Sequence, residues 1–167
     1  MWLGASIPRA RRVLPSGSWT PEDGDDRITL DFYARHRRRM RMTTDHGAAF
    51  LLDLAQTTQM RDGDALLLDS GRRIRVVAAP EKLLEVRCTN VHELARIAWH
   101  LGNRHLPVQV IDQVIRLRDD HVIADMLRQM GAEVAPVQKP FDPESGAYSA
   151  HSHPHRHGDE EHGHSHG

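Results

Sequence analysis

The sequence predicts an α+β protein with an N-terminal all-β domain, a C-terminal ferredoxin-like domain and a histidine-rich tail. Residues 28–77 consist of short apolar or alternating runs separated by turn residues, which is typical of a small all-β unit. After Pro80 the period changes, because segments with helical spacing alternate with strand-like runs. We therefore place the domains at residues 1–78 and 79–138, followed by a flexible tail at 139–167.

The first 27 residues of the first domain show no clear strand or helix pattern. Residues 1–27 combine an apolar start, an arginine-rich stretch and a loop rich in proline, glycine and aspartate. The basic run at 35–41 is interpreted as a strand whose basic side chains face solvent or a protein partner, because no recognition helix or aromatic platform favours nucleic acid. Further strands are predicted at 28–32, 50–54, 65–68 and 73–77.

The second domain has the element order βαββαβ, which is the plan of ferredoxin-like folds. Apolar residues at helical spacing predict helices at 91–101 and 122–130. Asn90 is suited to cap the start of the first helix, and Gly131 is suited to end the second. Strands are predicted at 83–88, 108–111, 114–117 and 133–137.

Composition excludes several functional classes. The net charge of −1 gives no general affinity for nucleic acid, and no apolar run is long enough to span a membrane. One cysteine excludes an internal disulfide and a cysteine-based zinc cluster. The short apolar start precedes its arginines, unlike a secretory signal, so we expect a cytoplasmic protein. Without an H-E-x-x-H motif or a clustered His/Asp pattern, we expect no metallohydrolase and no enzymatic activity.

Two histidines flank a helix-ending Gly-Asn pair in the stretch His100–Pro107. On one continuous helix their imidazoles would lie about 140° apart, so they could not share an ion from one helix face. Gly102 and Asn103 tolerate a left-handed helix end, which places His100 on the last helical turn and His105 on the following loop. A loop imidazole binds metal firmly only with ligands from another element or another copy of the chain.

The tail carries seven of the thirteen histidines, mostly at every second position. This spacing lets several imidazoles wrap around one ion, and the composition cannot form a core, so we expect disorder in the absence of metal. As a random coil, the chain beyond Lys139 reaches roughly 25–30 Å, enough to bring ions near His105. The candidate ligands are His151, His153, His155, His157, His162, His164 and His166.

Three motifs carry a resemblance to a known family. They are H-L-G-N-R-H-x-P at 100–107, the stretch 120–131, and F-D-P-E-S-G-A-Y at 141–148. They resemble the urease accessory protein UreE, a family of nickel metallochaperones, most specifically from Leu84 to Tyr148. The resemblance implies a homodimer formed by the ferredoxin-like domain. It also implies delivery of Ni²⁺ to the GTPase of the urease assembly system, and through it to the apo-urease complex, and we assign partner docking to the N-terminal domain.

The resemblance also implies particular ligands. The family's central metal-binding histidine falls on His105, and a two-fold axis nearby would supply it twice. His100 is either a helix-surface residue or a supplement to this site. At the junction before the second helix, one aspartate caps the helix, and Asp119 with His121 could hold an ion peripherally. Some family members have histidine at both ends of this triplet, so Asp119 departs from the pattern. The expected cargo is Ni²⁺, for which Zn²⁺ or Cu²⁺ can substitute at imidazole ligands.

A second interpretation is a general store or buffer for divalent metals, Ni, Zn or Cu, with no urease partner. In that case the tail would carry the function. A defined complex with a GTPase that depends on the folded domains would discriminate between the two interpretations.

Overall fold

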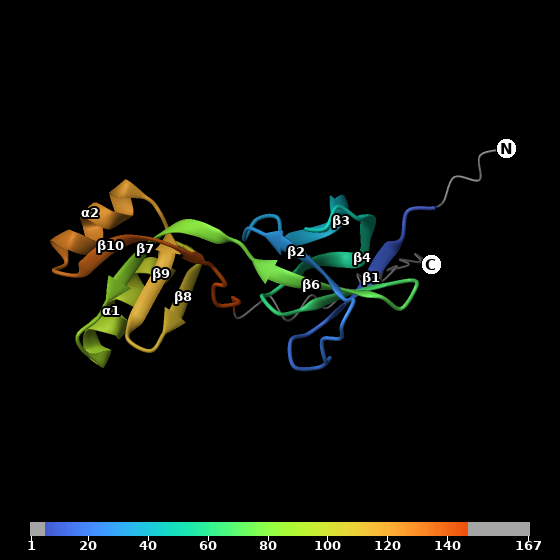
Figure 1. The fold of residues 1–167 in the computed structure, drawn as a ribbon. Coiled ribbons are helices and arrows are strands. Elements are labelled where there is room, and N and C mark those ends of the chain that lie inside the picture. Colours follow the sequence, from blue (N-terminus) through green and yellow to red (C-terminus); the bar gives the residue numbers. More distant parts are fainter. Residues whose placement is uncertain (1–5, 147–167) are drawn as a thin grey trace, which may run out of the picture.

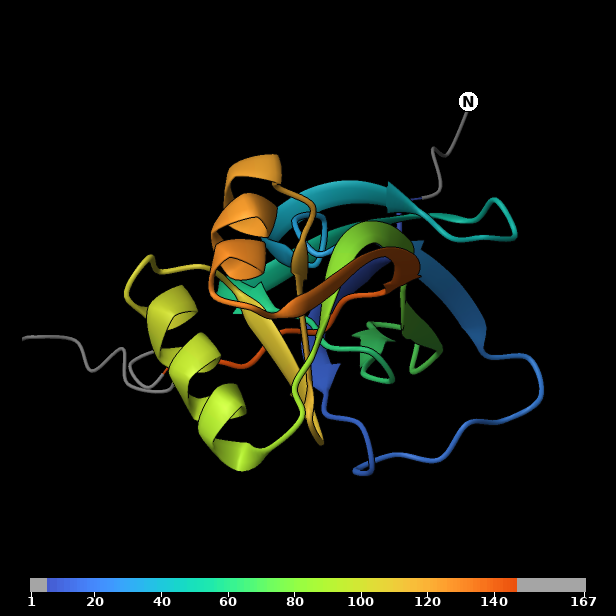
Figure 2. The same ribbon diagram turned by 90° about the vertical axis from the view of Figure 1, so that its left-hand side faces the viewer.

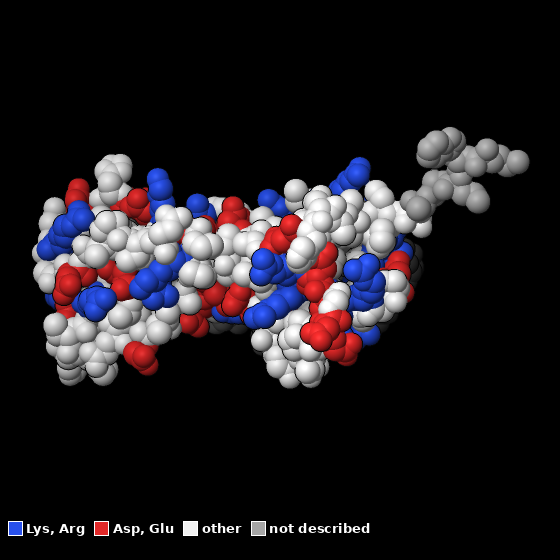
Figure 3. Space-filling view, in the orientation of Figure 1, with Lys and Arg blue, Asp and Glu red and all other residues white. Residues whose placement is uncertain are grey.

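The computed structural model describes residues 6–146 and has two parts that lie end to end (Figure 1). Each part is built on its own sheet, and both helices belong to the second part. Basic and acidic side chains are interspersed over the face seen in Figure 3, in keeping with the near-zero net charge. Within the described residues, no helix is both long and apolar enough to cross a membrane.

The N-terminal part is a six-stranded sheet in the order β2-β6-β5-β1-β4-β3. β1 runs parallel to β4 and β2 runs parallel to β6, whereas the other pairs are antiparallel. This confirms the predicted all-β class. The strands are β1 (Arg9–Leu14), β2 (Asp26–Leu30), β3 (His36–Thr43), β4 (Ala49–Gln59), β5 (Ala65–Leu68) and β6 (Arg73–Ala78).

The sequence pattern did not predict β1. Its residues R-A-R-R-V-L show no clean alternation, and only Ala10 among them is buried. The strand forms because β4 and β5 pair with it on either side. Alternation in its partner β4 buries Phe50, Leu52 and Leu54, which form much of the core of this part.

The C-terminal part has the strand order β10-β7-β9-β8, antiparallel throughout, and this is the ferredoxin-like arrangement that was predicted. Both helices pack on one face of this sheet, where residues from both helices, β7 and β9 form a single core (Figures 1 and 2). The elements are β7 (Pro80–Arg87), α1 (Val91–Gly102), β8 (Val108–Ile111), β9 (Val114–Arg118), α2 (His121–Gln129) and β10 (Glu133–Pro140).

The helix starts follow from side-chain caps. Asn90 Oδ1 accepts a hydrogen bond from the Glu93 N–H at 2.9 Å, which confirms the predicted cap of α1. Hydrogen bonds from the Thr89 hydroxyl and N–H, both 2.7 Å, lower the pKa of Glu93 and hold its carboxylate at the helix start. At α2 the cap is Asp120, whose Oδ1 accepts from two backbone N–H groups at 2.9 and 3.1 Å.

A segment that we call the strap, residues 141–146, follows β10 and joins the two parts. The prediction of a flexible tail from residue 139 is therefore wrong for residues 139–146, because β10 extends to Pro140 and hydrogen bonds hold the strap. The guanidinium of Arg35 is fully buried and donates to the carbonyls of Phe141 and Met60 and, at 2.9 Å, to the carboxylate of Asp142. On the other side, the Glu144 N–H donates to the β8 carbonyl of Val108 at 2.8 Å. The prediction that the basic side chains of 35–41 face solvent or a partner is therefore wrong for Arg35, because the strap covers it.

Candidate metal site

His105 lies three residues after the last residue of α1 and has a left-handed backbone conformation, with φ of +55°. Its N–H donates to the Gly102 carbonyl at 2.9 Å, and the Leu106 N–H donates to the Leu101 carbonyl at 3.4 Å. These two bonds define a Schellman helix end, in which the left-handed residue is usually glycine. His105 therefore occupies a position where a β-carbon is disfavoured.

The predicted left-handed conformation at Gly102 or Asn103 is wrong. Gly102 is the last residue of α1, and Asn103 has a helical φ of −62°. The turn comes later because Leu101 and Leu106 both pack against the core of the C-terminal part. These two side chains fix the residue at which the backbone can reverse, and that residue is His105.

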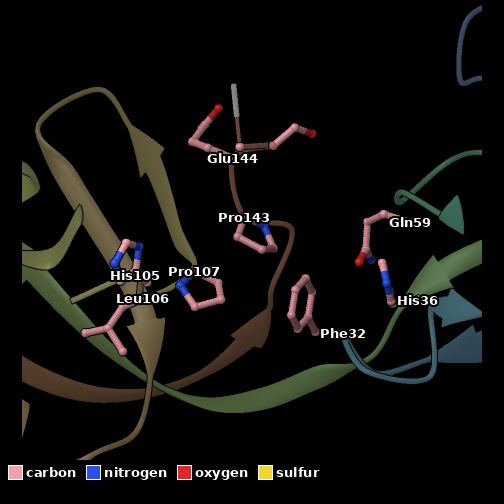
Figure 4. A pocket seen from close by; sticks show the side chains of 10 residues that line it. Phe32, His36, Gln59, His105, Leu106, Pro107, Pro143 and Glu144 are labelled. Carbon is pink, nitrogen blue, oxygen red and sulfur yellow. The ribbon is translucent and has the colours of Figure 1, made fainter. Parts of the chain in front are cut away.

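His105 lines a groove of about 450 Å³ between the two parts of the molecule. The N-terminal part contributes Phe32, His36 and Gln59, and the strap contributes Pro143 to Gly146. Figure 4 shows His105 on one wall and His36 on the opposite wall. His36 was not predicted to belong to this site, because only the packing of the two parts brings residues 36 and 105 to one groove.

His100 lies on the last turn of α1, as predicted, and is half-buried. Its ring packs edge-on against Trp99, with 5.0 Å between ring centroids. It is not among the residues that line the groove of His105. Its role as a supplementary ligand stays a prediction.

The other predicted ligands lie elsewhere. Asp119 is exposed, and its N–H donates to the Lys82 carbonyl at 3.2 Å. His121 is the exposed first residue of α2, while the intervening Asp120 is used as the cap. The seven tail histidines, His151 to His166, lie outside the described residues.

Between residues 6 and 146, no group of three or more His, Cys, Asp or Glu side chains is arranged to hold a metal ion. Firm metal binding by His105 therefore requires ligands that this part of one chain does not provide. Such ligands can come from a second copy of the chain or from residues beyond Gly146.

Exposed apolar side chains occur on the elements that immediately precede and follow His105. Trp99 on α1 is 63% exposed, and Val110 and Ile111 on β8 are each 36% exposed. β8 is also an edge strand of its sheet. Apolar side chains around a loop and an edge strand are features of surfaces that another protein covers.

Comparison with known proteins identifies the family. The family "UreE urease accessory protein, N-terminal domain" matches residues 7–79, and the family "UreE urease accessory protein, C-terminal domain" matches residues 81–167. The chain is 54% identical over 145 residues to the urease accessory protein UreE of Bradyrhizobium sp. (strain BTAi1), covering 87% of this chain and 70% of that protein. It is 54% identical to that of Rhodopseudomonas palustris (strain HaA2), covering 84% and 65%, and 45% identical to that of Ruegeria pomeroyi, covering 89% and 99%. The chain belongs to the UreE family of urease accessory proteins.

Proposed function

We propose that this protein is a cytoplasmic nickel metallochaperone that holds Ni²⁺ between the His105 residues of a homodimer and delivers it for urease maturation. The observation that carries the proposal is the conformation of His105. A left-handed non-glycine residue costs about 1–2 kcal/mol, and such strain persists where a side chain serves a function. Here the residue with this backbone strain is His105, whose imidazole is exposed.

A homodimer supplies ligands that residues 6–146 of one chain do not provide. If a two-fold axis passes near the end of α1, each subunit contributes one His105, and Trp99, Val110 and Ile111 become buried at the same interface. Imidazole binds Ni²⁺ well, and also Zn²⁺ and Cu²⁺, so these ions can substitute. His100, Asp119 and His121 are the proposed supplementary or peripheral ligands.

The proposed activity is transfer without catalysis. A site on an exposed helix end exchanges its ion more readily than a closed four-ligand structural site does. The tail histidines, His151 to His166, provide further imidazoles that collect ions and pass them to His105. No covalent step is required, so the protein acts as a carrier and not as an enzyme.

Partner docking is assigned to the N-terminal domain, and its outward sheet face supports this. Arg9 on β1 and Arg41 on β3 flank the half-buried Leu51 of β4. Asp53 pairs with Arg9 at 3.1 Å and with Arg39 at 3.6 Å, whereas Arg41 has no ion-pair partner in the described part of the chain. We call Arg9, Arg39, Arg41 and Leu51 the arginine face. Its net positive charge fits an acidic surface on the urease-assembly GTPase or the apo-urease complex.

Titration calorimetry with Ni²⁺ tests the proposal on the full chain and on His105→Gly, together with sedimentation to measure the dimer. We expect the wild-type dimer to bind one ion per dimer more tightly than the rest, and the variant to lose that ion and remain dimeric. Unchanged tight binding in His105→Gly, or a wild-type monomer that binds nickel equally well, would exclude the proposed centre.

A metal store remains the second candidate, because seven closely spaced tail histidines suit storage as well as transfer. Storage requires no partner. If the protein is only a metal store, charge reversal on the arginine face should leave metal binding and release unchanged.

A further inference from the structure

We propose that Asp142, clamped between Arg35 and Arg61, is a positioning residue that makes the histidine-rich end of the chain start from the wall of the His105 groove. The inference rests on the proposed function, because it takes His105 as the metal centre. It adds a residue that binds no metal itself and determines how effectively the tail histidines reach that centre.

Two arginines of the N-terminal part hold the strap from one side. Asp142 accepts from Arg35 at 2.9 Å and from Arg61 at 3.3 Å. Arg61 also donates to the Pro143 carbonyl at 3.1 Å and to the Ser145 hydroxyl at 2.9 Å. A carboxylate shared by two guanidinium groups makes strong, charge-assisted hydrogen bonds. The full burial of Arg35 makes the loss of its partner costly.

The C-terminal part holds the strap from the opposite side. The Asp142 N–H donates to the Gln109 side chain at 3.2 Å, and the Glu144 N–H donates to the Val108 carbonyl at 2.8 Å. Pro143 is buried. The strap is thus fixed to both parts, and its residues line the groove that His105 also lines (Figure 4). Any chain that continues beyond Gly146 therefore begins beside His105.

The consequence for metal binding follows from tether length. With the clamp closed, the first tail histidine, His151, follows the last residue of the strap, Gly146, by five positions in the sequence. With the clamp open, it follows Pro140, where β10 ends, by eleven positions. For a linker longer than the span it must cross, effective concentration falls as about the −3/2 power of linker length, so we expect opening the clamp to lower it about threefold for His151. The clamp therefore raises the affinity for the ion at His105 without contacting the ion.

The test measures the Ni²⁺ affinity of the full chain by calorimetric competition with a chelator. Asp142→Asn removes the charge that both arginines bind, and Arg61→Glu repels Asp142 from a half-exposed position. Asp53→Asn is the matched control, because Asp53 is also a carboxylate between two arginines, with 20% side-chain exposure against 23% for Asp142. Thermal unfolding of each variant establishes that it is folded.

We expect Asp142→Asn and Arg61→Glu to weaken the tightest Ni²⁺ binding about threefold, with no change in Asp53→Asn. The effect should vanish when residues 151–167 are deleted and when His105 is replaced by glycine. A purely structural role for the clamp would not depend on the tail. Wild-type affinity in Asp142→Asn, or an equal loss in the tail-deleted protein, overturns the inference.

The two proposals fail in different ways. If His105→Gly binds nickel as tightly as the wild type, the metal centre itself is wrong. If His105→Gly loses the tight ion while Asp142→Asn and Arg61→Glu keep it, the centre stands and only the role of the clamp is refuted.

Discussion

His105 occupies, at the end of α1, the backbone position that Gly131 occupies at the end of α2. The Gly131 N–H donates to the Arg128 carbonyl at 2.9 Å, and the Ala132 N–H donates to the Leu127 carbonyl at 3.1 Å, in the same pattern of bonds that surrounds His105. Both residues have positive φ, +84° for Gly131 and +55° for His105. One helix thus ends with the residue that suits this conformation, and the other ends with an imidazole.

His105→Gly is expected to stabilise the fold in the absence of metal. Glycine adopts positive φ without the steric cost that a β-carbon brings, although its greater freedom in the unfolded chain offsets part of the gain. The expected increase in the free energy of unfolding is about 0.5–1 kcal/mol, measured by urea denaturation of the metal-free protein. Gly131→Ala, the reciprocal change at the matched position, should lower it by about 1 kcal/mol. A clear destabilisation by His105→Gly would mean that the imidazole has a structural contact.

Much of the C-terminal part could be predicted because its signals are local. The periodicity of two short helices, the Asn90 cap and the glycine at the end of α2 all act within a few residues. The helix itself ends within one residue of the prediction, but the left-handed residue that follows it was placed incorrectly, because its position depends on Leu101 and Leu106 reaching one core. The Gly-Asn pair is a local signal, and tertiary packing overrode it.

The features that remained unpredicted depend on contacts distant in sequence. Arg35 is buried because Asp142, 107 residues later, returns to meet it. His36 and His105 face each other across one groove only because the strap joins the two parts and brings them together. A basic run is ordinarily a solvated surface, so sequence alone could not identify the one arginine in it that is buried.

Deleting residues 151–167 should reduce the number of Ni²⁺ ions bound and leave one per dimer. The deletion removes seven imidazoles and leaves both copies of His105 in place. Metal analysis after gel filtration, with the dimer concentration measured on the same sample, gives the ratio. A truncated protein that binds no nickel would show that the folded domains contain no metal centre.

Metal loading should fall as the pH drops through about 6.5, where ordinary imidazoles become protonated and lose the lone pair that binds metal. Equilibrium dialysis between pH 5 and 8, at fixed total nickel, measures this dependence. Full loading retained at pH 5 would indicate that carboxylates, rather than imidazoles, hold the ion.

The double variant Arg39→Glu/Arg41→Glu should weaken binding of the urease-assembly GTPase at least tenfold and leave nickel affinity unchanged. Reversing two charges turns attraction for an acidic surface into repulsion, and like charges brought together cost several kcal/mol. Both side chains are exposed, so the fold should tolerate the change. Binding is measured by interferometry at two salt concentrations, with Arg128→Glu on α2 as the control for an exposed arginine elsewhere. Equal partner binding by the double variant would favour the storage function.

Glu85→Gln is expected to destabilise the C-terminal part in a pH-dependent manner. The buried Glu85 carboxylate accepts from Lys139 at 2.8 Å, Arg116 at 3.0 Å and Arg87 at 3.3 Å. The hydrogen bond from Lys139, and then that from Arg116, lower the pKa of Glu85 despite its burial. Its three partners are partly exposed, so we expect a loss of only about 1–2 kcal/mol at pH 7.

The sign of the pH dependence follows from the lowered pKa. In the unfolded chain Glu85 protonates near its ordinary pKa of 4.5, whereas in the folded protein it stays ionised to lower pH. Its contribution to stability is therefore fully present above that value and disappears as the pH falls through the folded-state pKa. The difference in the free energy of unfolding between wild type and Glu85→Gln, measured by urea denaturation, should shrink steadily below about pH 4.5. Asp125→Asn, which breaks the exposed pair with Arg128, should change stability by less than about 0.5 kcal/mol. A gap for Glu85→Gln that stays constant down to pH 3 would assign the loss to packing and not to charge.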